Sequence, residues 1–310
     1  MAGGFSLTTP LRTAALYNPS TGIWTTAASM NFSRDFFTAS VLNDGRVLAV
    51  GGLSIGPILA SAEIYNPSTN TWTLTGSLVT GRQRQIATVL PNGNVLVTGG
   101  RNSGGALNSA ELFNPAGTGT WTPGGTFTDA RFEHTATLLN NSKVLVVGGD
   151  SGSGALATCQ LYDPITNTWA NTSSLNSARY RHTATLLPDG RVLVAGGTNN
   201  TAPLDSCELY DPLSGTWSPT NNLNDERAFH TASLLPTGFV LAAGGYNETN
   251  DSVRTSELYD PSTSTWTFTI ELNDRRYLHT ATLLSNGIVL AVGGFGGPGD
   301  ILNGTELYEL

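Results

Sequence analysis

Six arginines recur at one fixed place in this 310-residue chain, each three residues before a position that is histidine in four of six copies. A guanidinium presents a planar fork of donors that suits carboxylates, phosphates and polyols. The arginines are Arg34, Arg82, Arg131, Arg179, Arg227 and Arg276. The histidine position reads Phe37, Gln85, His134, His182, His230 and His279, which includes every histidine of the chain. These residues are our candidate ligand-binding set for a small polar or anionic ligand.

A structural role for the same arginines is the competing interpretation. Six arginines close together would repel one another unless compensated, and a mostly glutamate position recurs in matching register with them. That position reads Glu63, Glu111, Gln160, Glu208, Glu257 and Glu306. A site for one ligand has no need of six copies, whereas arginine–glutamate pairs that hold repeats together would recur in every copy. We therefore expect most of the arginines to be buried against these glutamates.

The elements that position these residues follow from an internal repeat. Tryptophans and the second glycines of six Gly-Gly pairs recur with the same successive spacings of 48, 49, 48, 48 and 49 residues. A shared period of this length is the signature of a repeat architecture. The tryptophans are Trp24, Trp72, Trp121, Trp169, Trp217 and Trp266, and the glycines are Gly52, Gly100, Gly149, Gly197, Gly245 and Gly294.

Each repeat is predicted to form four strands. In the fourth copy a first strand over His182–Leu187 and a second over Arg191–Ala195 flank Pro188-Asp189-Gly190, which suits a hairpin turn. A variable loop then leads to a third strand at Cys207–Tyr210, and the fourth strand carries the tryptophan. Small Thr and Ala side chains on first strands and large aromatic ones on the outer strands suit sheets that converge toward an axis and diverge outward.

The glycine pair followed by a spaced tyrosine and tryptophan, at a period near 50 residues, resembles the kelch family over essentially the whole chain. The resemblance implies an all-β, six-bladed β-propeller of four-stranded antiparallel blades. It implies no single activity, because kelch propellers include peptide-binding adaptors, sugar-processing enzymes and copper radical oxidases. In animal kelch adaptors, arginines near one mouth of the propeller bind acidic peptides, so the arginines here are expected to be able to do likewise.

The two ends of the chain contain one third strand too many. Residues 1–310 are expected to be a single propeller domain whose last blade is shared between the N- and C-termini. Residues 14–17 and 305–308 compete for its third-strand position, and we assign it to the C-terminal copy because Glu306 can pair with an arginine where Ala15 cannot. The displaced N-terminal copy could lie outside the Trp24 strand as a fifth strand or pair with another molecule. A monomer is expected, with strand exchange through this surplus strand as the alternative.

The connections between second and third strands predict where a partner binds. They differ freely between repeats, whereas the tight turns on the other side barely vary. A regular frame that varies on one side is typical of a binding surface on a rigid scaffold. The leading hypothesis is a non-enzymatic scaffold that binds a protein or a small polar or anionic ligand at the mouth formed by these loops. Drift of unselected loops is the alternative explanation.

Two further hypotheses stay open. One is a carbohydrate-acting enzyme similar to a kelch sugar mutarotase, with Arg227 beside Glu226 or Arg276 beside Asp274 as the arginine–carboxylate pair. The other is a purely architectural or engineered repeat unit. Copper is not expected, because the tyrosine that precedes a histidine ligand in copper radical oxidases is missing before all four histidines here. We predict no metal and no other cofactor.

Composition excludes other classes of partner. The net charge of −8 and the absence of a basic stripe argue against nucleic acid, and no apolar run approaches the length of a membrane span. Cys159 and Cys207 are one repeat apart, so they are expected to be unbridged packing residues. No secretion signal is visible at the start, while the lysine-poor surface weakly favours an extracellular or cell-envelope location.

Overall fold

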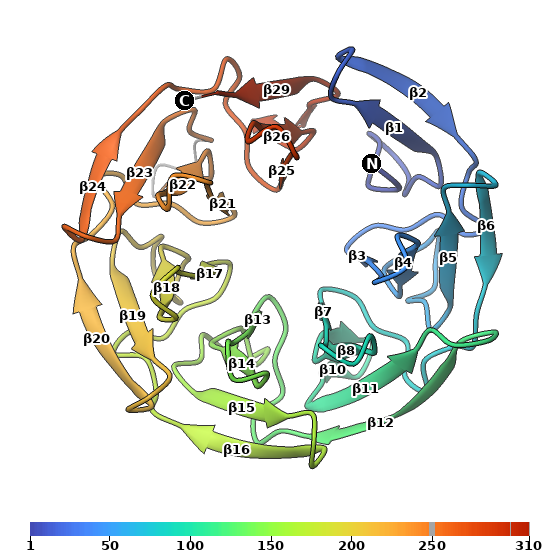
Figure 1. The fold of residues 1–310 in the computed structure, drawn as a ribbon, viewed down its shortest axis with the longest axis horizontal. Coiled ribbons are helices and arrows are strands. Elements are labelled where there is room, and N and C mark those ends of the chain that lie inside the picture. Colours follow the sequence, from blue (N-terminus) through green and yellow to red (C-terminus); the bar gives the residue numbers. More distant parts are fainter. Residues whose placement is uncertain (248–251, 298, 310) are drawn as a thin grey trace. The chain divides into compact units, whose positions relative to one another are not determined.

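The computed structural model describes residues 1–247, 252–297 and 299–309, and strands are the only regular elements in these ranges (Figure 1). No helix in these ranges is long and apolar enough to cross a membrane. The all-β architecture predicted from the repeat is confirmed.

Five sheets contain four antiparallel strands each, one sheet per repeat. The first two are β3 (Thr38–Val41), β4 (Val47–Val50), β5 (Ala62–Asn66) and β6 (Thr71–Leu74), then β7 (Ile86–Val89), β8 (Val95–Thr98), β11 (Ser109–Asn114) and β12 (Thr120–Thr126). The third is β13 (Thr135–Leu138), β14 (Val144–Val147), β15 (Cys159–Asp163) and β16 (Thr168–Thr172). The last two are β17 (Thr183–Leu186), β18 (Val192–Ala195), β19 (Cys207–Asp211) and β20 (Thr216–Thr220), then β21 (Thr231–Leu234), β22 (Val240–Ala243), β23 (Ser256–Asp260) and β24 (Thr265–Phe268).

The sixth repeat forms a sheet of three strands among the described residues, in the order β25 (Thr280–Leu283), β26 (Val289–Val292) and β29 (Thr305–Tyr308). Near the N-terminus, β1 (Ala14–Asn18) and β2 (Ile23–Ala27) form a two-stranded sheet. Two short hairpins lie in the variable loops. They are β9 (Arg101–Asn102) with β10 (Gly105–Ala106), and β27 (Phe295–Gly297) with β28 (Asp300–Ile301).

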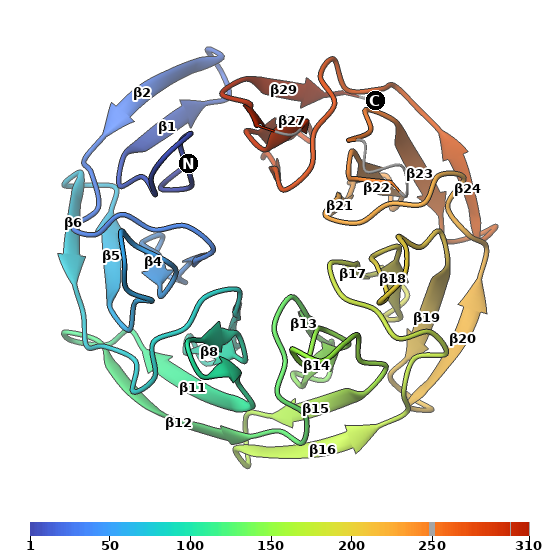
Figure 2. The same cartoon turned by 180° about the vertical axis from the view of Figure 1, so that it is seen from behind.

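The chain divides into two compact units, which we describe separately. Unit 1 comprises Met1–Leu145, Asp150–Gly152 and Gln160–Ala170. Unit 2 comprises Val146–Gly149, Ser153–Cys159 and Asn171–Leu310. Figure 2 shows the same repeated strand order from the opposite side. The expectation of a single domain whose last blade is shared between the two ends concerns the two units together and stays a prediction.

Burial along each sheet follows the residue types of its strands. In the fourth repeat the second strand, β18, is Val-Leu-Val-Ala and is buried throughout, whereas the fourth strand, β20, is mostly exposed. The turn between β17 and β18 is closed by a hydrogen bond from the N–H of Gly190 to the carbonyl of Leu187 (2.9 Å), and Gly190 has a φ of 89°. That conformation is the left-handed one for which glycine was predicted here.

The recurring tyrosine and tryptophan are packing residues, as predicted. In the fourth repeat Tyr210 lies opposite Trp217, with ring centroids 5.0 Å apart, and the indole N–H donates to the carbonyl of Ser173 in the preceding repeat (3.0 Å). Large rings thus fill the space between outer strands and also hold neighbouring repeats together. Cys159 and Cys207 are both buried and form no disulfide, as expected.

The assignment of the disputed third strand is confirmed within unit 2. β29 pairs with β26, with Glu306 opposite Ala291, and the guanidinium of Arg276 forms an ion pair with Glu306. In unit 1 the N-terminal copy of the third strand is β1, which pairs with β2. The Gly3-Gly4 pair lies where the tail of a second strand would be, since the N–H of Gly4 donates to the carbonyl of Arg34 (2.8 Å).

Candidate functional site

The six recurring arginines are fully buried, with no exposed surface. Arg179, in the loop before β17, shows the arrangement. Its Nη1 donates to the carbonyls of Gly196 (2.7 Å) and Ser206 (2.8 Å), and its Nη2 donates to Oε1 of Glu208 (3.2 Å). Burial lowers the pKa of Arg179, and the adjacent Glu208 carboxylate opposes that shift. The arginine therefore joins its own loop to the second and third strands of the same repeat.

The predicted arginine–glutamate pairs are present in five repeats. The partners are Arg34–Glu63, Arg82–Glu111, Arg179–Glu208, Arg227–Glu257 and Arg276–Glu306. Each glutamate lies on the third strand of the arginine's own sheet, which the sequence register left undecided. In the third repeat Gln160 replaces the glutamate, and Asp129 lies 3.6 Å from the guanidinium of Arg131.

The glutamates also fix the loop that precedes each first strand. Oε2 of Glu208 accepts the N–H of Asn176 (2.8 Å), and Oε1 accepts the N–H of Ser177 (3.2 Å). In the last repeat burial alone would raise the pKa of Glu306, but hydrogen bonds from the backbone of Asn273 and Asp274 and from Arg276 lower it. Each carboxylate is therefore occupied by groups of the protein itself.

The four histidines are buried too, at no more than 6% exposure. Nε2 of His134 lies 2.9 Å from Oγ1 of Thr98, the last residue of β8, whereas His230 and His279 contact Thr183 (3.0 Å) and Thr231 (2.9 Å), the first residues of β17 and β21. Burial lowers the pKa of His134 and His279 to about 3, with a smaller contribution from the neighbouring arginines. These imidazoles are therefore neutral at physiological pH.

The Gly-Gly pairs exist because the loop of the next repeat docks on them. In unit 2 the N–H of Gly197 donates to the carbonyl of Arg227 (2.8 Å). At Gly244 an added Cβ would lie 2.5 Å from the carbonyl oxygen of Arg276 and 3.0 Å from Cε1 of His279. Glycine, arginine and histidine thus form one contact between successive repeats. This contact explains why all three recur together.

The histidines do not fit a copper or zinc centre. Among the described residues no group of three or more His, Cys, Asp or Glu side chains converges. Nε2 of His134, His230 and His279 faces a threonine hydroxyl, and the residue before each is Glu133, Phe229 or Leu278, none of them a tyrosine. We derive no metal chemistry from this set.

The arginines of the enzyme hypothesis are bound by groups of the protein itself. Nη2 of Arg276 lies 3.7 Å from Oδ2 of Asp274, but the arginine side chain has no exposed surface, and Glu306 and the carbonyl of Gly293 occupy its guanidinium. Arg227 is buried in the same way against Glu257.

A cavity of about 300 Å³ lies beside Asp274 in unit 2. Its other lining residues are Arg254, Asn273, Arg275, Gly296, Asp300 and Leu302. Arg254 forms an ion pair with Glu271 at 2.7 Å. The cavity lies on the side of the repeats where first strands begin and second strands end, which we call the loop edge. The opposite side, with the tight turns, is the turn edge.

A second set of residues at the loop edge was missed as a site by the sequence analysis. They are the residues immediately before the histidine positions, which we call the tip residues. Their φ values lie between 50° and 58° in all six repeats, although none of them is glycine. They are Phe36, Arg84, Glu133, Arg181, Phe229 and Leu278. A left-handed conformation costs an L-residue about 1–2 kcal/mol, so six copies of it require compensation.

Backbone hydrogen bonds between successive tips supply part of that compensation. In unit 1 the N–H of Arg84 donates to the carbonyl of Phe36 (2.9 Å), and in unit 2 the N–H of Phe229 donates to the carbonyl of Arg181 (3.1 Å). The N–H of Leu278 donates in turn to the carbonyl of Phe229 (3.1 Å). The backbone of the tip is thus the same in every repeat, while its side chain differs.

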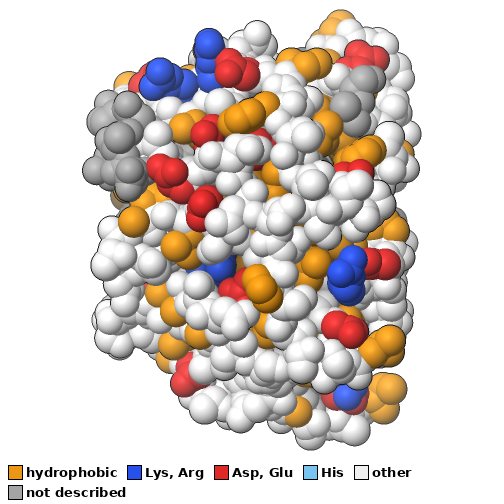
Figure 3. Space-filling view, turned by 90° about the vertical axis from the view of Figure 1, so that its left-hand side faces the viewer, with side chains coloured by type: hydrophobic (Ala, Val, Ile, Leu, Met, Phe, Trp, Pro, Cys, Tyr) orange, Lys and Arg blue, Asp and Glu red, His pale blue; other side chains and the backbone are white. Residues whose placement is uncertain are grey.

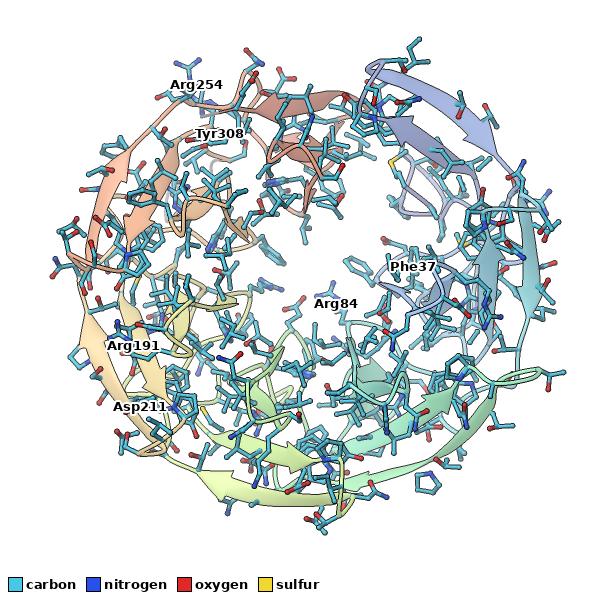
Figure 4. The ribbon with its side chains drawn as sticks, in the orientation of Figure 1. Phe37, Arg84, Arg191, Asp211, Arg254 and Tyr308 are labelled. Atoms are coloured by element: carbon cyan, nitrogen blue, oxygen red, sulfur yellow. The ribbon has the colours of Figure 1, made fainter. Side chains whose placement is uncertain are left out.

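In unit 1 the tip residue Arg84 lies between the aromatic ring of one neighbouring tip residue and the carboxylate of the other. The guanidinium carbon of Arg84 lies 4.2 Å from the centroid of the Phe36 ring, and Arg84 forms an ion pair with Glu133. The Arg84 side chain keeps 24% of its surface exposed. Figure 4 shows Arg84 on the inner side of its sheet, away from β11 and β12.

The unit 2 tips lead into a row of aromatic rings. The guanidinium carbon of Arg181 lies 4.1 Å from the centroid of Phe229 and 4.9 Å from that of Tyr180. Phe229 contacts Tyr277 (6.2 Å between centroids), and Tyr277 stacks on Phe295 (5.6 Å). All five residues are partly exposed. Arginine and aromatic side chains of this kind are enriched where proteins bind partners.

The sequence held a signal for the tips. They occupy a fixed place two residues after each recurring arginine and differ in chemistry from repeat to repeat, whereas the arginine itself is the same in all six. Their left-handed backbone had no signal, because the residues that favour it, glycine and asparagine, are absent.

The comparisons with known proteins agree with this geometry. No curated protein matches the chain. A solved structure titled as a novel fungal alcohol oxidase of the AA5 family, in complex with copper, is similar, with 20% sequence identity and a TM-score of 0.78. The match covers 95% of this chain but only 66% of the oxidase, and at this identity it shows the fold alone, a β-propeller.

Two family models also match. The kelch motif matches residues 37–78, and the "KLHDC2/KLHL20/DRC7 Kelch-repeats domain" matches residues 86–297, which is more than half of the chain. The prediction of a kelch fold with six blades is therefore confirmed. The chain belongs to the family of KLHDC2/KLHL20/DRC7 kelch-repeat domains.

Proposed function

We propose that this chain is a non-enzymatic binding scaffold, and that it takes a protein or a small polar or anionic ligand at the loop edge. The tip position carries the proposal, because its strained backbone is retained in six repeats while its side chain is of four different types. Strained residues cluster where a protein binds ligands, since the surrounding structure must hold them in place. A position that is kept for its backbone and varied in its side chain suits the presentation of chemical groups to a partner.

The tip residues, and not the buried arginines, supply the accessible charge in this proposal. Arg84 and Arg181 are partly exposed and lie on the faces of Phe36 and Phe229. Stacking holds each guanidinium in a fixed orientation at the loop edge, where a ligand would meet it. Contact of a ligand with the buried arginines and histidines stays a prediction, and it would require the loop edge to open.

The side of the molecule drawn in Figure 3 offers few basic side chains to a partner. Figure 3 shows one side of the molecule, on which lysine and arginine side chains are few and scattered. The chain as a whole has 15 basic residues against 23 acidic ones, and the prediction of no nucleic-acid partner rests on this balance.

A panel of acidic, neutral and basic 15-residue peptides, together with a glycan array, tests the proposal on the full chain. Ligands that bind are then measured by calorimetry on Arg84→Ser and Arg181→Ser. Loss of a charge-assisted hydrogen bond should weaken a loop-edge ligand by about tenfold or more. Arg46→Ser and Arg191→Ser are matched controls, because these arginines lie at the turn edge beside Asp44 and Asp189. Figure 4 labels Arg84 and Arg191.

The loop-edge and turn-edge variants should give opposite binding results, depending on which of the two edges holds the ligand. If the proposal holds, the turn-edge variants bind as the wild type does. If the turn-edge variants lose the ligand and the loop-edge variants keep it, the proposed site is wrong. Turnover of a sugar from the glycan array would instead support the enzyme hypothesis.

A further inference from the structure

Four aromatic residues at the loop edge of unit 2 form a connected set, which we call the aromatic row. They are Phe229, Tyr246, Tyr277 and Phe295. The ring centroid of Tyr277 lies 6.2 Å from that of Phe229 and 6.1 Å from that of Tyr246. It lies 5.6 Å from that of Phe295, on which the ring is stacked. All four residues are partly exposed, so a partner can reach them.

The backbone fixes the position of these rings. The N–H of Tyr277 donates to the carbonyl of Phe295 (3.0 Å), and the N–H of Phe295 donates to the carbonyl of Tyr277 (2.9 Å). The N–H of Tyr246 donates in the same way to the carbonyl of Ala228 (2.9 Å). A tyrosine or phenylalanine has only two side-chain torsions. A ring on a fixed backbone therefore loses little conformational entropy when a partner docks on it.

Arginine side chains already lie on aromatic rings at the loop edge of both units. Three such pairs have 4.1–5.0 Å between the guanidinium carbon and the ring centroid, and they are Arg84 on Phe36, Arg101 on Phe132 and Arg181 on Phe229. Within the described ranges no arginine or lysine lies over Tyr277 or Phe295, and the tip of their repeat is Leu278. The aromatic row therefore has a cation at its Phe229 end and, among these residues, none at its Tyr277–Phe295 end.

The two units also differ in charge. Unit 2 contains 15 acidic and seven basic residues, whereas unit 1 contains eight of each, so the whole net charge of −8 belongs to unit 2. At the loop edge of unit 2, Arg254 is paired with Glu271 (2.7 Å), and Arg275 also interacts within the protein. A field of one sign attracts groups of the opposite sign and speeds their association. Unit 2 is thus complementary to a cation of a partner.

Two carboxylates lie on the chain segments that hold the Tyr277–Phe295 pair. Asp274 precedes Tyr277 by three residues, and its side chain is 59% exposed. Its nearest guanidinium, that of Arg276, is already paired with Glu306. The exposed Asp300 lies in β28, which pairs with β27, and it forms no hydrogen bond or ion pair with a described residue. These carboxylates give the ring pair a negative surrounding.

We propose that the Tyr277–Phe295 end of the aromatic row binds an arginine of a partner protein. The guanidinium lies on the exposed surface of this ring pair, as that of Arg181 lies on Phe229, and the carboxylates of the flanking segments attract it. This inference rests on the proposed function, because it takes a protein as the loop-edge ligand and names the group that unit 2 recognises.

Arginine fits this end of the row better than lysine does. A guanidinium is planar and more weakly hydrated than an ammonium, so it stacks on an aromatic face with a smaller loss of solvation. The protein itself uses arginine in this way at Phe36 and Phe229. An uncharged apolar side chain could also cover the rings, but the excess of acidic residues in unit 2 would contribute nothing to its binding.

Arg181 sets the spacing to a second group of the same partner. Its guanidinium carbon lies 4.1 Å from the Phe229 centroid, which lies 6.2 Å from that of Tyr277. These distances place the Arg181 guanidinium within about 10 Å of the Tyr277 ring. An extended chain covers about 3.3–3.6 Å per residue, so a carboxylate that bonds Arg181 and an arginine that stacks on Tyr277 lie about three residues apart in the partner.

The test uses the full chain and an eight-residue peptide of glycine and serine that contains an aspartate and, three residues later, an arginine. Two further peptides carry citrulline, which is the uncharged counterpart of arginine, or lysine in its place. NMR titration of the Leu278 and Gly296 amide signals gives the dissociation constants. The citrulline peptide should bind about fivefold more weakly than the arginine peptide, the size of a cation–π contact at an exposed site. A lysine peptide that binds as tightly as the arginine peptide overturns the choice of arginine.

Variants of the protein locate this charge effect on the ring pair. Tyr277→Leu should weaken the arginine peptide about fivefold and leave the citrulline peptide nearly unchanged, because the ring and the charge act on each other. The unchanged citrulline peptide also shows that the variant is folded. Tyr277→Phe keeps the ring and should bind both peptides as the wild type does. Phe268→Leu is the matched control, since Phe268 is a 56% exposed ring of unit 2 on the outer strand β24.

The failure of this inference differs from the failure of the proposed function. Equal affinities for the arginine and citrulline peptides, equal losses of both in Tyr277→Leu, or the same loss in Phe268→Leu overturn the inference. The proposed function survives these results if Arg181→Ser still weakens the peptides through their aspartate. If no peptide and no glycan binds at the loop edge, the proposed function fails as well.

Discussion

Arg82 and Arg84 lie two residues apart in the loop that leads into β7, yet their surroundings differ completely. Arg82 has no exposed surface and is bound by Glu111 and by the carbonyls of Gly99 and Ser109. Arg84 is partly exposed and lies on the face of Phe36. The first arginine recurs in every repeat, whereas the second position holds four different residue types across the six repeats. In this chain a charged residue that recurs is part of the buried frame, whereas the varying residue beside it is partly exposed at the loop edge, where we propose that a partner binds.

The largest expected effect on stability comes from removing Arg82, one of the six buried arginines that recur in the repeats. Arg82→Ala leaves the Glu111 carboxylate buried without its cation, which should reduce the free energy of unfolding by about 3–5 kcal/mol. Arg84→Ala is the matched control, and it should cost less, about 1–2 kcal/mol, because the Arg84 side chain keeps 24% of its surface exposed although Glu133 keeps only 9%. Urea denaturation of the two variants measures the difference. Equal losses would contradict the division into frame and surface.

The frame was largely predictable because its chemistry repeats. The spacing of tryptophans and glycine pairs predicted the six repeats, and the shared register of arginine and glutamate predicted their pairing. Register cannot tell which repeat supplies the glutamate, since a shift by one whole repeat leaves the pattern unchanged. That required the sheets, which place each pair within one repeat.

The tip residues could not be predicted in the same way. Phe36, Arg84 and Leu278 share a backbone conformation but no side-chain property, and their sequence carries no glycine or asparagine to indicate a positive φ. The conformation is imposed from outside, by hydrogen bonds such as that from the N–H of Leu278 to the carbonyl of Phe229. Tertiary context of this kind is absent from any single repeat.

An effect of intermediate size tests whether the buried histidines are neutral packing residues or titratable binding groups. The pKa of His279 is lowered to about 3 by burial, while in the unfolded chain it is near 6.5. The unfolded chain therefore binds the extra proton between these values. The contribution of His279 to the free energy of unfolding is complete above pH 6.5 and falls as the pH is lowered toward 3, by up to about 1.4 kcal/mol per pH unit.

The variant His279→Gln should remove that dependence. Glutamine is compatible with this position, because in the second repeat Gln85 occupies it and donates to the carbonyl of Val50 (2.8 Å). Urea denaturation from pH 7.5 to 4.5 should show a shallower loss of stability for the variant than for the wild type. Parallel curves would mean that the pKa of His279 is the same in the folded and the unfolded chain, and a charged ligand-binding role for the histidines would regain support.

The smallest expected effect compares two leucines of similar exposure in the sixth repeat. Leu278 is a tip residue with φ of 55° and is 37% exposed, and Leu283 lies in β25 and is 41% exposed. Leu283→Gly should reduce the free energy of unfolding by about 1 kcal/mol, because glycine weakens a strand through backbone entropy and the loss of a packed side chain. At Leu278 the same entropy cost is offset by relief of the left-handed conformation, which is worth about 1–2 kcal/mol. Leu278→Gly should therefore be neutral or stabilising by about 0.5 kcal/mol, and thermal denaturation of both variants measures the contrast. If Leu278→Gly costs as much as Leu283→Gly, the tip side chain is packing the frame and not being presented, and the distinction drawn between Arg82 and Arg84 does not extend to the other repeats.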